Sequence, residues 1–354
     1  MKNLKDFESE INKCSKCGLC QSVCPVYKIT GNDCAVSKGK FVMLKGVLKN
    51  DLKLNKTINK YLDMCLKCGK CKDFCPSDID VCKIFETAKY EYAKNTILGK
   101  IIFFLQSKFV FGNLLKIIKM TKHFEQPNRQ AAKFLYFRGC AGKFSNNTIE
   151  LLKNFNIEVI EQDFDCCGIP FLSSGNLERF EEVKKFNKSL IEKSEFDYIL
   201  TDCASCESTL RSYFEDDRYK FISLGEVLQK LNLKFKSKKP LKITFHKPCH
   251  LRNADFIKPL FENIENVEYI ESEGFDDCCG FAGEFALKNR KISRAISKKK
   301  VQNIINTGAD YVITTCPACI FGLKQGLKEY KSKIKVIDLS EFLNSIYLIP
   351  QLPF

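Results

Sequence analysis

Two cysteine runs near the start of the chain restrict its possible folds more than any other feature. Each has the form C-x2-C-x2-C-x3-C-P, and they lie at residues 14–25 and 65–76. At this spacing, three thiolates of one run hold a [4Fe-4S] cube and the fourth binds the cube of the other run. The ligands predicted by this rule are Cys14, Cys17, Cys20 and Cys75 for one cube, and Cys65, Cys68, Cys71 and Cys24 for the other.

A pair of zinc sites is the alternative interpretation of these runs. Zinc takes four tetrahedral ligands, which proteins typically supply as separated C-x2-C pairs. Zinc leaves unexplained the third cysteine at the same interval and the Cys-Pro that ends both runs. Gly18 and Gly69 suit tight turns that bring three sulfur atoms together, and the proline ends each ligand turn. The runs therefore favour iron-sulfur clusters over a zinc-stabilised scaffold without redox function.

The other cysteines reveal an internal duplication. Of the 20 cysteines, ten precede residue 97, none lies at 97–133, and ten follow. The last ten form two sets in the same order, C, then CCG, then C-x2-C, and matching cysteines are 109 to 113 residues apart. A repeat kept this closely is one supersecondary unit used twice. The sets are Cys140, Cys166, Cys167, Cys203 and Cys206, and Cys249, Cys278, Cys279, Cys316 and Cys319.

The hydrophobic pattern of each half predicts an α/β fold with a mostly parallel sheet. Because open α/β sheets bind ligands beyond the carboxyl ends of their strands, cysteines that follow strands are expected to converge there. Cys140, Cys203, Cys249 and Cys316 have this position. The predicted strands lie at 135–137, 158–160, 198–201, 243–245, 267–270 and 311–314, and predicted helices include 177–193, 207–214, 292–305 and 320–330.

Each set of five cysteines is best interpreted as a metal-cluster site. One cube or one zinc ion needs four ligands, so the fifth thiol is either spare or part of a larger cluster. The final C-x2-C of each set precedes a predicted helix, and a helix N-terminus lowers the pKa of a thiol. Pro317 suits the first turn of such a helix. Redox-active dithiols and inert packing are the alternatives.

The first ten residues indicate a cytoplasmic protein with reduced thiols. They mix Lys, Asp and Glu with isolated apolar residues, so the pattern of an export signal is missing. The most apolar stretch, 97–120, is interrupted by four lysines and is not expected to span a membrane. Its helical spacing predicts a helix that packs between domains. The alternative is docking on a partner or, peripherally, on the inner face of the cytoplasmic membrane.

Several functions lack the residues that they need. The net charge of +15 comes from lysines scattered through the chain, without a basic and aromatic stripe, so nucleic-acid binding is not expected. Neither G-x-G-x-x-G nor G-x4-G-K-[ST] occurs, so no flavin or other nucleotide is expected on this chain. G-x-S-x-G is missing as well. An organic oxidation would therefore need a hydride acceptor on another subunit.

The whole pattern resembles the cysteine-rich CCG domain family. That family includes subunits of heterodisulfide reductase, the iron-sulfur subunits of glycolate and D-lactate oxidases, and the C subunit of anaerobic glycerol-3-phosphate dehydrogenase. The resemblance is strongest to the glycolate and D-lactate oxidase iron-sulfur subunit and covers nearly the whole chain. Beside the two N-terminal runs, it rests on FHKPCH (245–250), DDCCGFAGEFAL (276–287) and TTCPACIFGL (314–323).

The resemblance implies a mainly helical, two-cluster ferredoxin-type domain followed by a duplicated α/β, Rossmann-like CCG domain. With the cysteine density, the expected boundaries are 1–96 for the ferredoxin-type domain, 97–133 for a helical linker, and 134–235 and 236–354 for the CCG domains. In the heterodisulfide reductase branch, each complete five-cysteine motif holds a noncubane [4Fe-4S] assembly. One or two further clusters, noncubane or ordinary cubes, are thus expected beside the two [4Fe-4S] cubes.

The function implied by the resemblance is electron transfer. An FAD-containing dehydrogenase subunit would oxidise a 2-hydroxyacid such as glycolate or D-lactate, and this chain would pass the electrons toward membrane quinone, directly or through another subunit. Alternatives are a heterodisulfide-reductase-like subunit, or one like the C subunit of anaerobic glycerol-3-phosphate dehydrogenase, with catalysis at a CCG cluster. No catalytic residue is predicted.

Two cysteines and three histidines stay outside these sets. Cys34 and Cys82 are expected to be buried, inert thiols. His123, His246 and His250 are the only histidines. His250 follows Cys249 directly and is expected to pack beside a cluster or hydrogen-bond one of its sulfur atoms, without being a catalyst.

Overall fold

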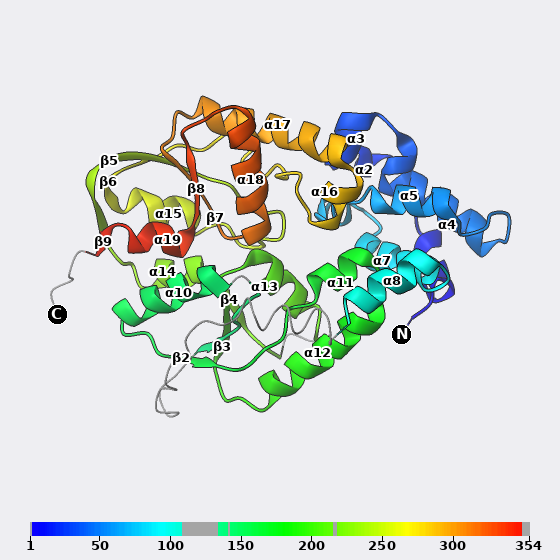
Figure 1. Cartoon of the computed structure of the whole chain (residues 1–354), viewed down its shortest axis with the longest axis horizontal. Coiled ribbons are helices and arrows are strands. Elements are labelled where there is room, and N and C mark those ends of the chain that lie inside the picture. Colours follow the sequence, from blue (N-terminus) through cyan, green and yellow to red (C-terminus); the bar gives the residue numbers. More distant parts are fainter. Residues whose placement is uncertain (1, 108–133, 141, 215–217, 349–354) are drawn as a thin grey trace. The chain divides into compact units, whose positions relative to one another are not determined.

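The computed structural model describes residues 2–107, 134–140, 142–214 and 218–348 (Figure 1). The chain divides into two compact units, each discontinuous in sequence. Residues 108–133 of the predicted linker, and with them His123, lie outside the described residues. Unit 1 comprises Met1–Phe111, Gly168–Glu181 and Cys278–Lys299, and unit 2 comprises Gly112–Cys167, Glu182–Asp277 and Lys300–Phe354.

Unit 1 is mainly helical, as expected for its N-terminal part. Several of its helices begin at capping residues: Asn55, Asp80 and Thr96 each accept a backbone N–H of the first helical turn through the side chain. The N-terminal α-helices are α1 (Glu8–Asn12), α2 (Leu19–Val23), α3 (Pro25–Thr30), α4 (Ser37–Leu48), α5 (Lys56–Asp63), α6 (Lys70–Asp73), α7 (Val81–Lys94) and α8 (Ile97–Leu105). The 3-10 helices are η1 (Leu4–Phe7) and η2 (Asp33–Ala35).

Two later segments belong to unit 1, and each begins at or beside a CCG motif. The first carries α11 (Ile169–Ser174), and the second carries α16 (Glu284–Lys288). At Gly175 the first segment comes so close to α7 that a Cβ would lie 2.8 Å from Cβ of Lys89. The second segment shares an apolar cluster with the N-terminal helices: Val26, Ala35, Leu66, Cys278, Phe285 and Ile296.

Unit 2 contains two parallel sheets with the same strand order. The order is β2-β1-β3-β4 in the first and β6-β5-β7-β8 in the second, where a short antiparallel β9 also pairs with β5. This identity of topology confirms the duplication. The strands are β1 (Phe134–Tyr136), β2 (Val159–Glu161), β3 (Tyr198–Thr201), β4 (Phe221–Ser223), β5 (Phe235–Phe245), β6 (Ile264–Tyr269), β7 (Tyr311–Thr314), β8 (Lys335–Asp338) and β9 (Tyr347–Leu348).

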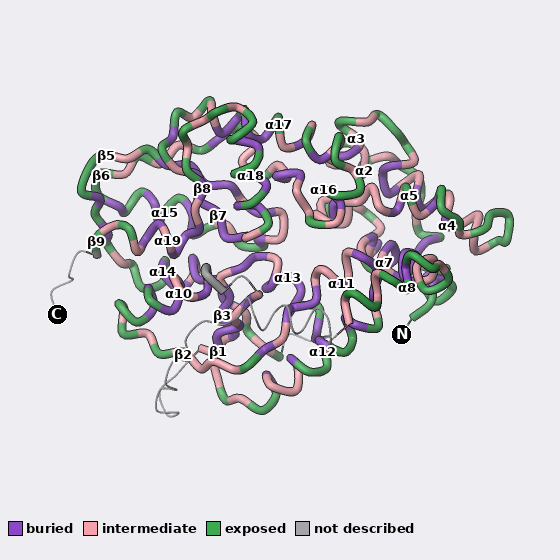
Figure 2. The backbone as a smooth tube through the Cα atoms, viewed as in Figure 1, coloured by how far each residue is buried: buried purple, intermediate pink, exposed green. Residues whose placement is uncertain are grey.

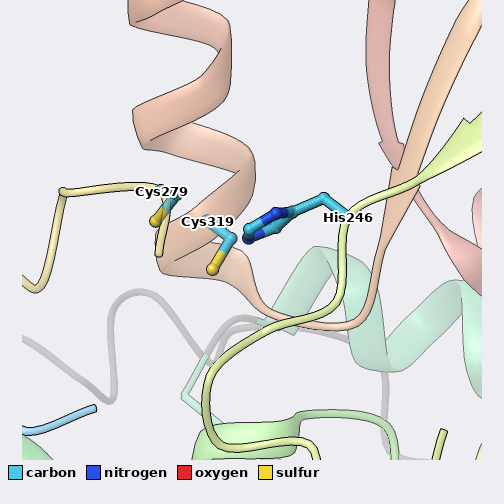
Figure 3. Close-up of side chains that lie close together, drawn as sticks. All are labelled: His246, Cys279 and Cys319. Atoms are coloured by element: carbon cyan, nitrogen blue, oxygen red, sulfur yellow. The ribbon is translucent and has the colours of Figure 1, made fainter. Parts of the chain in front are cut away.

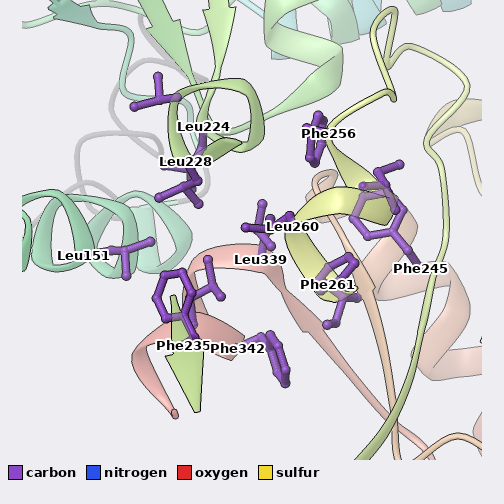
Figure 4. Packing of buried hydrophobic residues seen from close by; sticks show 14 of the residues in the cluster. Leu151, Leu224, Leu228, Phe235, Phe245, Phe256, Leu260, Phe261, Leu339 and Phe342 are labelled. Atoms are coloured by element: carbon purple, nitrogen blue, oxygen red, sulfur yellow. The ribbon is translucent and has the colours of Figure 1, made fainter. Parts of the chain in front are cut away.

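Both sheets of unit 2 contribute to one hydrophobic core. Tyr136 and Leu200 of the first sheet belong to the same buried cluster as Phe245 and Ile313 of the second. Figure 4 shows Phe235, Phe261 and Phe342 among the aromatic rings of this cluster, and Figure 2 marks its buried positions along the chain.

The helices of unit 2 are α10 (Gly142–Asn154), α13 (Ala204–Arg211), α14 (Leu224–Lys230), α15 (Ile257–Glu262), α18 (Pro317–Glu329) and α19 (Leu339–Asn344). Two more, α12 (Leu177–Glu192) and α17 (Arg290–Asn306), begin in unit 1 and end in unit 2.

Candidate metal centres

The two N-terminal cysteine runs fold into the same backbone shape. Gly18 and Gly69 have φ of 87° and 77°, which is the left-handed region that glycine adopts readily. Lys16 and Lys67, just before the second cysteine of each run, also have positive φ, 62° and 54°. The predicted glycine turns are confirmed. The left-handed lysines are not predictable from residue type, because this conformation is uncommon for lysine.

The thiols predicted for the first cube line a single pocket of unit 1, together with Cys71. Burial raises the pKa of Cys20, and the neighbouring Cys14 and Cys17 raise it further. Crowded thiols of this kind lose their protons when a metal binds. The four predicted thiols in the pocket are Cys14, Cys17, Cys20 and Cys75.

The thiols predicted for the second cube also lie together in unit 1. Burial raises the pKa of Cys71, and Cys65, Cys68 and Cys24 are close enough to its sulfur to influence it. Burial likewise raises the pKa of Cys24. Pro25 follows Cys24 as the first residue of α3, a position that proline favours. In both groups, the fourth cysteine of one run therefore lies near cysteines of the other.

Two further groups near these thiols were not identified by the motifs. Lys40 is only 2% exposed, and its Nζ donates a hydrogen bond to the Met64 carbonyl oxygen at 3.1 Å. Its positive charge acts on the thiol of Cys24, where it favours the thiolate. Cys82 lies near Cys65 and Cys71, and burial raises its pKa well above the ordinary value. The sequence could not identify Lys40 as buried, because nothing in the sequence distinguishes a buried lysine in a helix from an exposed one.

The first CCG set lies within unit 2, at the carboxyl ends of the first sheet. Cys203 is the N-cap of α13, and Cys206 follows in its first turn. Cys206 is hydrogen-bonded with Cys167 and with Cys203, and these contacts together with burial raise its pKa well above the ordinary value. Tyr213 donates a hydrogen bond to the Cys167 carbonyl oxygen at 2.8 Å. Cys167 is thereby held by contacts with Cys206 of α13 and with Tyr213, which lies just beyond the end of that helix.

The two CCG sets meet within unit 2. Cys203 of the first set and Cys316 of the second are hydrogen-bonded through their thiols. Behind them, the Ala204 N–H donates to the Thr315 carbonyl oxygen at 3.0 Å. Hydrogen bonds from Cys203 and Cys319 hold the pKa of Cys316 well below the ordinary value. The pocket at this contact is lined by Cys140, Cys203, Cys206 and Cys316, with Asp202, Asp338 and Ser340 among its polar residues.

The expectation that strand-end cysteines converge is therefore confirmed for Cys140, Cys203 and Cys316, which line one pocket. Cys249 is not among the residues that line it. His250 approaches the same region through a serine: its Nδ1 lies 3.0 Å from Ser205 Oγ, which lies 3.5 Å from Cys316 Sγ. Ser205 thus links His250 to Cys316, a cysteine of the second set.

Glycine follows each cysteine pair for a steric reason. Gly168 and Gly280 have φ of 88° and 81°. A Cβ on Gly280 would also lie 2.7 Å from the Ser293 carbonyl oxygen. The Gly280 N–H donates a hydrogen bond to Cys278 Sγ at 3.3 Å.

In unit 1, Cys278 belongs to the same apolar cluster as Leu66, and Cys24 and Cys68 pack against that cluster.

Comparison with known families agrees with this arrangement of thiols. The model of the cysteine-rich CCG domain matches residues 134–211 and again 243–324, and that of the 4Fe-4S dicluster domain matches residues 10–79. The chain belongs to the CCG family of iron-sulfur proteins. The dicluster match bears out iron-sulfur clusters rather than zinc for the N-terminal runs of this CCG protein.

Relatives of the CCG protein include subunits of several oxidoreductases. One subunit of the CoM/CoB fumarate reductase of Methanothermobacter marburgensis is 26% identical, covering 96% of this chain and 73% of its own length. The probable glycolate oxidase iron-sulfur subunit of Bacillus subtilis is 22% identical, covering 95% and 94%. One subunit of the dihydromethanophenazine:CoB–CoM heterodisulfide reductase of Methanosarcina acetivorans is 23% identical, covering 93% and 92%.

Among solved structures, a hypothetical protein from Helicobacter pylori has a similar fold. It aligns with a TM-score of 0.52 at 12% identity, covering 87% of this chain and 66% of that one. At this identity the likeness concerns the fold alone. Within the described part of the CCG protein, no helix is both long and apolar enough to cross a membrane.

The donor set of the CCG protein fits iron-sulfur clusters. Its thiols are gathered in groups, and most of those in the CCG sets are buried. One further potential ligand is the imidazole of His246, which is 1% exposed and lies near Cys319 (Figure 3). Burial lowers the pKa of His246 to about 3, and the nearby Lys300 contributes, so the ring is neutral at pH 7.

Proposed function

We propose that this chain is the electron-transfer subunit of a flavin-dependent dehydrogenase that oxidises a 2-hydroxyacid, glycolate or D-lactate. One observation carries the electron-transfer assignment. Cys24 and Cys68, assigned to the second cube, pack against the apolar cluster that contains Cys278 of a CCG set. Such packing supports a short path from the dicluster domain to the CCG region. The glycolate oxidase relative, aligned along 95% of the chain, supports the substrate class.

The ligand roles in this proposal follow the groups of neighbouring thiols. Iron-sulfur clusters would supply one-electron transfer at these positions. The protein holds the thiols at fixed turns, and the buried ammonium of Lys40 balances negative charge near Cys24. The proposed ligands are Cys14, Cys17, Cys20 and Cys75 for one cube, Cys65, Cys68, Cys71 and Cys24 for the other, and the two five-cysteine sets for further clusters.

A separate FAD-containing subunit is proposed as the electron donor. Oxidation of a hydroxyacid removes two electrons together with a hydrogen, and this chain has no dinucleotide motif with which to receive a hydride. A flavin accepts the pair and releases the electrons singly, which matches the one-electron capacity of each cube. Membrane quinone is proposed as the final acceptor.

Anaerobic co-purification of the native complex tests this function. Glycolate or D-lactate, added to the complex, is expected to bleach the iron-sulfur absorbance at about 400 nm. The isolated chain is expected to stay unbleached by either acid. A flavin-containing complex in which neither acid reduces the clusters would contradict the proposed substrate class. Bleaching of the isolated chain would contradict the need for a flavoprotein.

A second candidate function is reduction of a disulfide at the CCG region itself. The pocket that contains Cys140, Cys203 and Cys316 favours it, because it places polar side chains beside thiols. The heterodisulfide reductase relative has this chemistry in its name. Purified chain with reduced viologen and the CoM–CoB heterodisulfide should then turn over without a partner. A chain that keeps its iron but shows no turnover would exclude this function.

We further propose that α8 docks the protein on an anionic membrane surface. Its apolar stripe is exposed rather than packed between domains: Ile97, Leu98, Ile101, Phe104 and Leu105 are 50–81% exposed. These positions recur at helical spacing and form one face. The opposite side is covered in part, because Phe103 stacks on Tyr90 of α7 with ring centroids 6.2 Å apart.

Charge identifies the surface that this stripe fits. Residues 92–124 contain six lysines and neither Asp nor Glu. Each lysine near an anionic bilayer contributes about 1 kcal/mol, while the apolar face enters the boundary between headgroups and acyl chains. An interfacial helix of this kind would bring the clusters close to the quinone pool without a transmembrane span.

Phe104→Glu is expected to weaken binding to vesicles of phosphatidylglycerol and phosphatidylcholine by at least about tenfold, because an inserted phenylalanine contributes about 1.5–3 kcal/mol. Leu287→Glu, at an 84% exposed leucine outside α8, is the matched control and should bind like the wild type. Co-sedimentation measures both. The docking proposal fails if wild-type protein ignores anionic vesicles, or if both variants lose binding equally. Loss of flavoprotein binding in Phe104→Glu alone would instead make α8 a protein interface.

A further inference from the structure

His246 is held rigidly at the carboxyl end of the second sheet. It follows the last residue of β5, and its backbone N–H donates to the Ile313 carbonyl oxygen of β7 at 2.9 Å. The side chain is 1% exposed. Figure 3 shows the imidazole beside Cys319, which lies in the first turn of α18. His246 thus lies at the carboxyl ends of the neighbouring strands β5 and β7, the edge at which α/β sheets bind ligands.

The imidazole of His246 lacks the partners that burial demands. Neither Nδ1 nor Nε2 has a hydrogen-bond partner among the described residues. A buried polar group without a partner costs about 1–3 kcal/mol. Neutral imidazole carries one donor and one acceptor nitrogen, so a metal bound to the acceptor would satisfy half of this demand. Of the buried side chains in the described part of the chain that have an unpartnered polar atom, His246 is the one with two.

Cys319 offers the second donor atom for such a metal. A ring nitrogen of His246 and Cys319 Sγ lie within 4.8 Å of each other. With metal–nitrogen and metal–sulfur bonds of about 2.0 and 2.3 Å, two ligands of one tetrahedral metal stand about 3.5 Å apart. Because the His246 nitrogen and Cys319 Sγ lie within 4.8 Å of each other, a small movement of the two side chains is enough to reach this separation. Neutral imidazole also binds a metal without releasing a proton, whereas each thiol must release one.

The first half of the duplication has no counterpart to this ligand. Phe137 occupies the place of His246, three residues ahead of the first cysteine of its set, and its backbone N–H likewise donates to the neighbouring strand, at the Leu200 carbonyl oxygen. A phenyl ring has no lone pair with which to bind a metal. The two CCG sets are therefore chemically different although their cysteines match one for one.

We propose that His246 is an iron ligand of the second CCG set, bound to the same iron as Cys319. The inference rests on the proposed assignment of a cluster to that set. Imidazole in place of thiolate removes negative charge from a cluster and raises its reduction potential, as in Rieske centres. The second set would then attract electrons more strongly than the first, which gives the CCG region a direction of electron flow.

Nitrogen labelling tests the ligand directly. Protein grown with 15N-histidine has only three labelled side chains. Pulsed EPR of the reduced protein is expected to show a strong 15N coupling in the wild type and in His250→Ala, and to lose it in His246→Ala. His250 is the matched control because it lies near the same set, through Ser205 and Cys316. A coupling that survives His246→Ala would overturn the proposal.

Iron retention separates a ligand from a packing residue. His246→Leu is expected to lose iron from the second set at least about tenfold faster under chelator challenge. The same variant should melt no lower than wild type as iron-free protein, since leucine removes the unsatisfied ring. His246→Cys, which restores a donor atom, should recover iron retention. If wild-type protein binds no iron beyond the two cubes, the cluster assignment itself fails. Iron without a 15N coupling overturns only the role of His246.

Discussion

Cys71→Ser is expected to remove one cube and stop electron transfer from substrate to quinone. Cys71 lies among Cys65, Cys68 and Cys24, and burial keeps its metal-free thiol protonated. Serine offers a much poorer ligand for iron than a soft thiolate. Iron content should fall by about four atoms per chain. Turnover should fall to background, while glycolate or D-lactate still reduces the flavin of the partner subunit.

Cys82→Ser is the matched control for this prediction. Cys82 is half-buried beside Cys65 and Cys71 yet lies outside both cysteine runs. Serine there changes the same atom in the same environment and should leave iron content and turnover close to wild type. Unchanged turnover in Cys71→Ser would exclude the second cube from the electron path. Equal iron loss in the control would mean that Cys82 is itself a ligand.

Local sequence patterns were sufficient to predict those strands and helices that depend mainly on the residues within them. The predicted strands at 198–201 and 311–314 coincide with β3 and β7, because runs of buried β-branched and aromatic residues are distinctive. The helices after Cys203 and Cys316 also form, three residues earlier than expected at 207 and 320, because each cysteine serves as the N-cap. Strands β4 and β8 were not predicted, because β4 has only three residues and β8 has a charged residue at each end, Lys335 and Asp338.

Tertiary contacts explain what the sequence did not reveal. Convergence of the strand-end cysteines was expected, but the direct thiol contact between Cys203 and Cys316, which joins equivalent members of the two sets, was not. Lys40 and His246 are buried polar groups whose surroundings come from distant segments. Neither residue type signals burial, because lysine is normally exposed and histidine occurs in both environments.

Tertiary contacts also determine which segments of the chain make up unit 1. The segments Gly168–Glu181 and Cys278–Lys299 join the N-terminal helices although a long stretch of chain separates them. Each segment leaves its CCG motif through a left-handed glycine and then packs on α7 or its neighbours. These contacts place Cys278 in the cluster against which Cys24 and Cys68 pack. The docking of the segments is therefore a requirement for the proposed electron path, and its strength can be tested at one residue.

Lys89→Met is expected to loosen both segments from α7. The Lys89 ammonium is 2.8 Å from an Asp63 carboxylate oxygen and 3.1 Å from one of Glu284 in the second segment. It also donates a hydrogen bond to the Ser173 carbonyl oxygen of the first segment. Breaking a buried ion pair costs about 3–5 kcal/mol. Because Lys288 still pairs with both carboxylates, at 2.9 and 2.7 Å, the lower end of that range is expected.

Hydrogen exchange measures this loosening segment by segment. A loss of about 3 kcal/mol should speed amide exchange in α11 and α16 by roughly 100-fold, while β3 and β7 of unit 2 keep their protection. Lys83→Met, at an exposed lysine of the same helix, should change neither. Adding Glu284→Gln to Lys89→Met should recover part of the protection, because it removes a carboxylate left short of positive charge. Unchanged exchange in Lys89→Met would show that apolar packing alone holds the segments. Fast exchange with undiminished electron transfer would show that the path avoids Cys278.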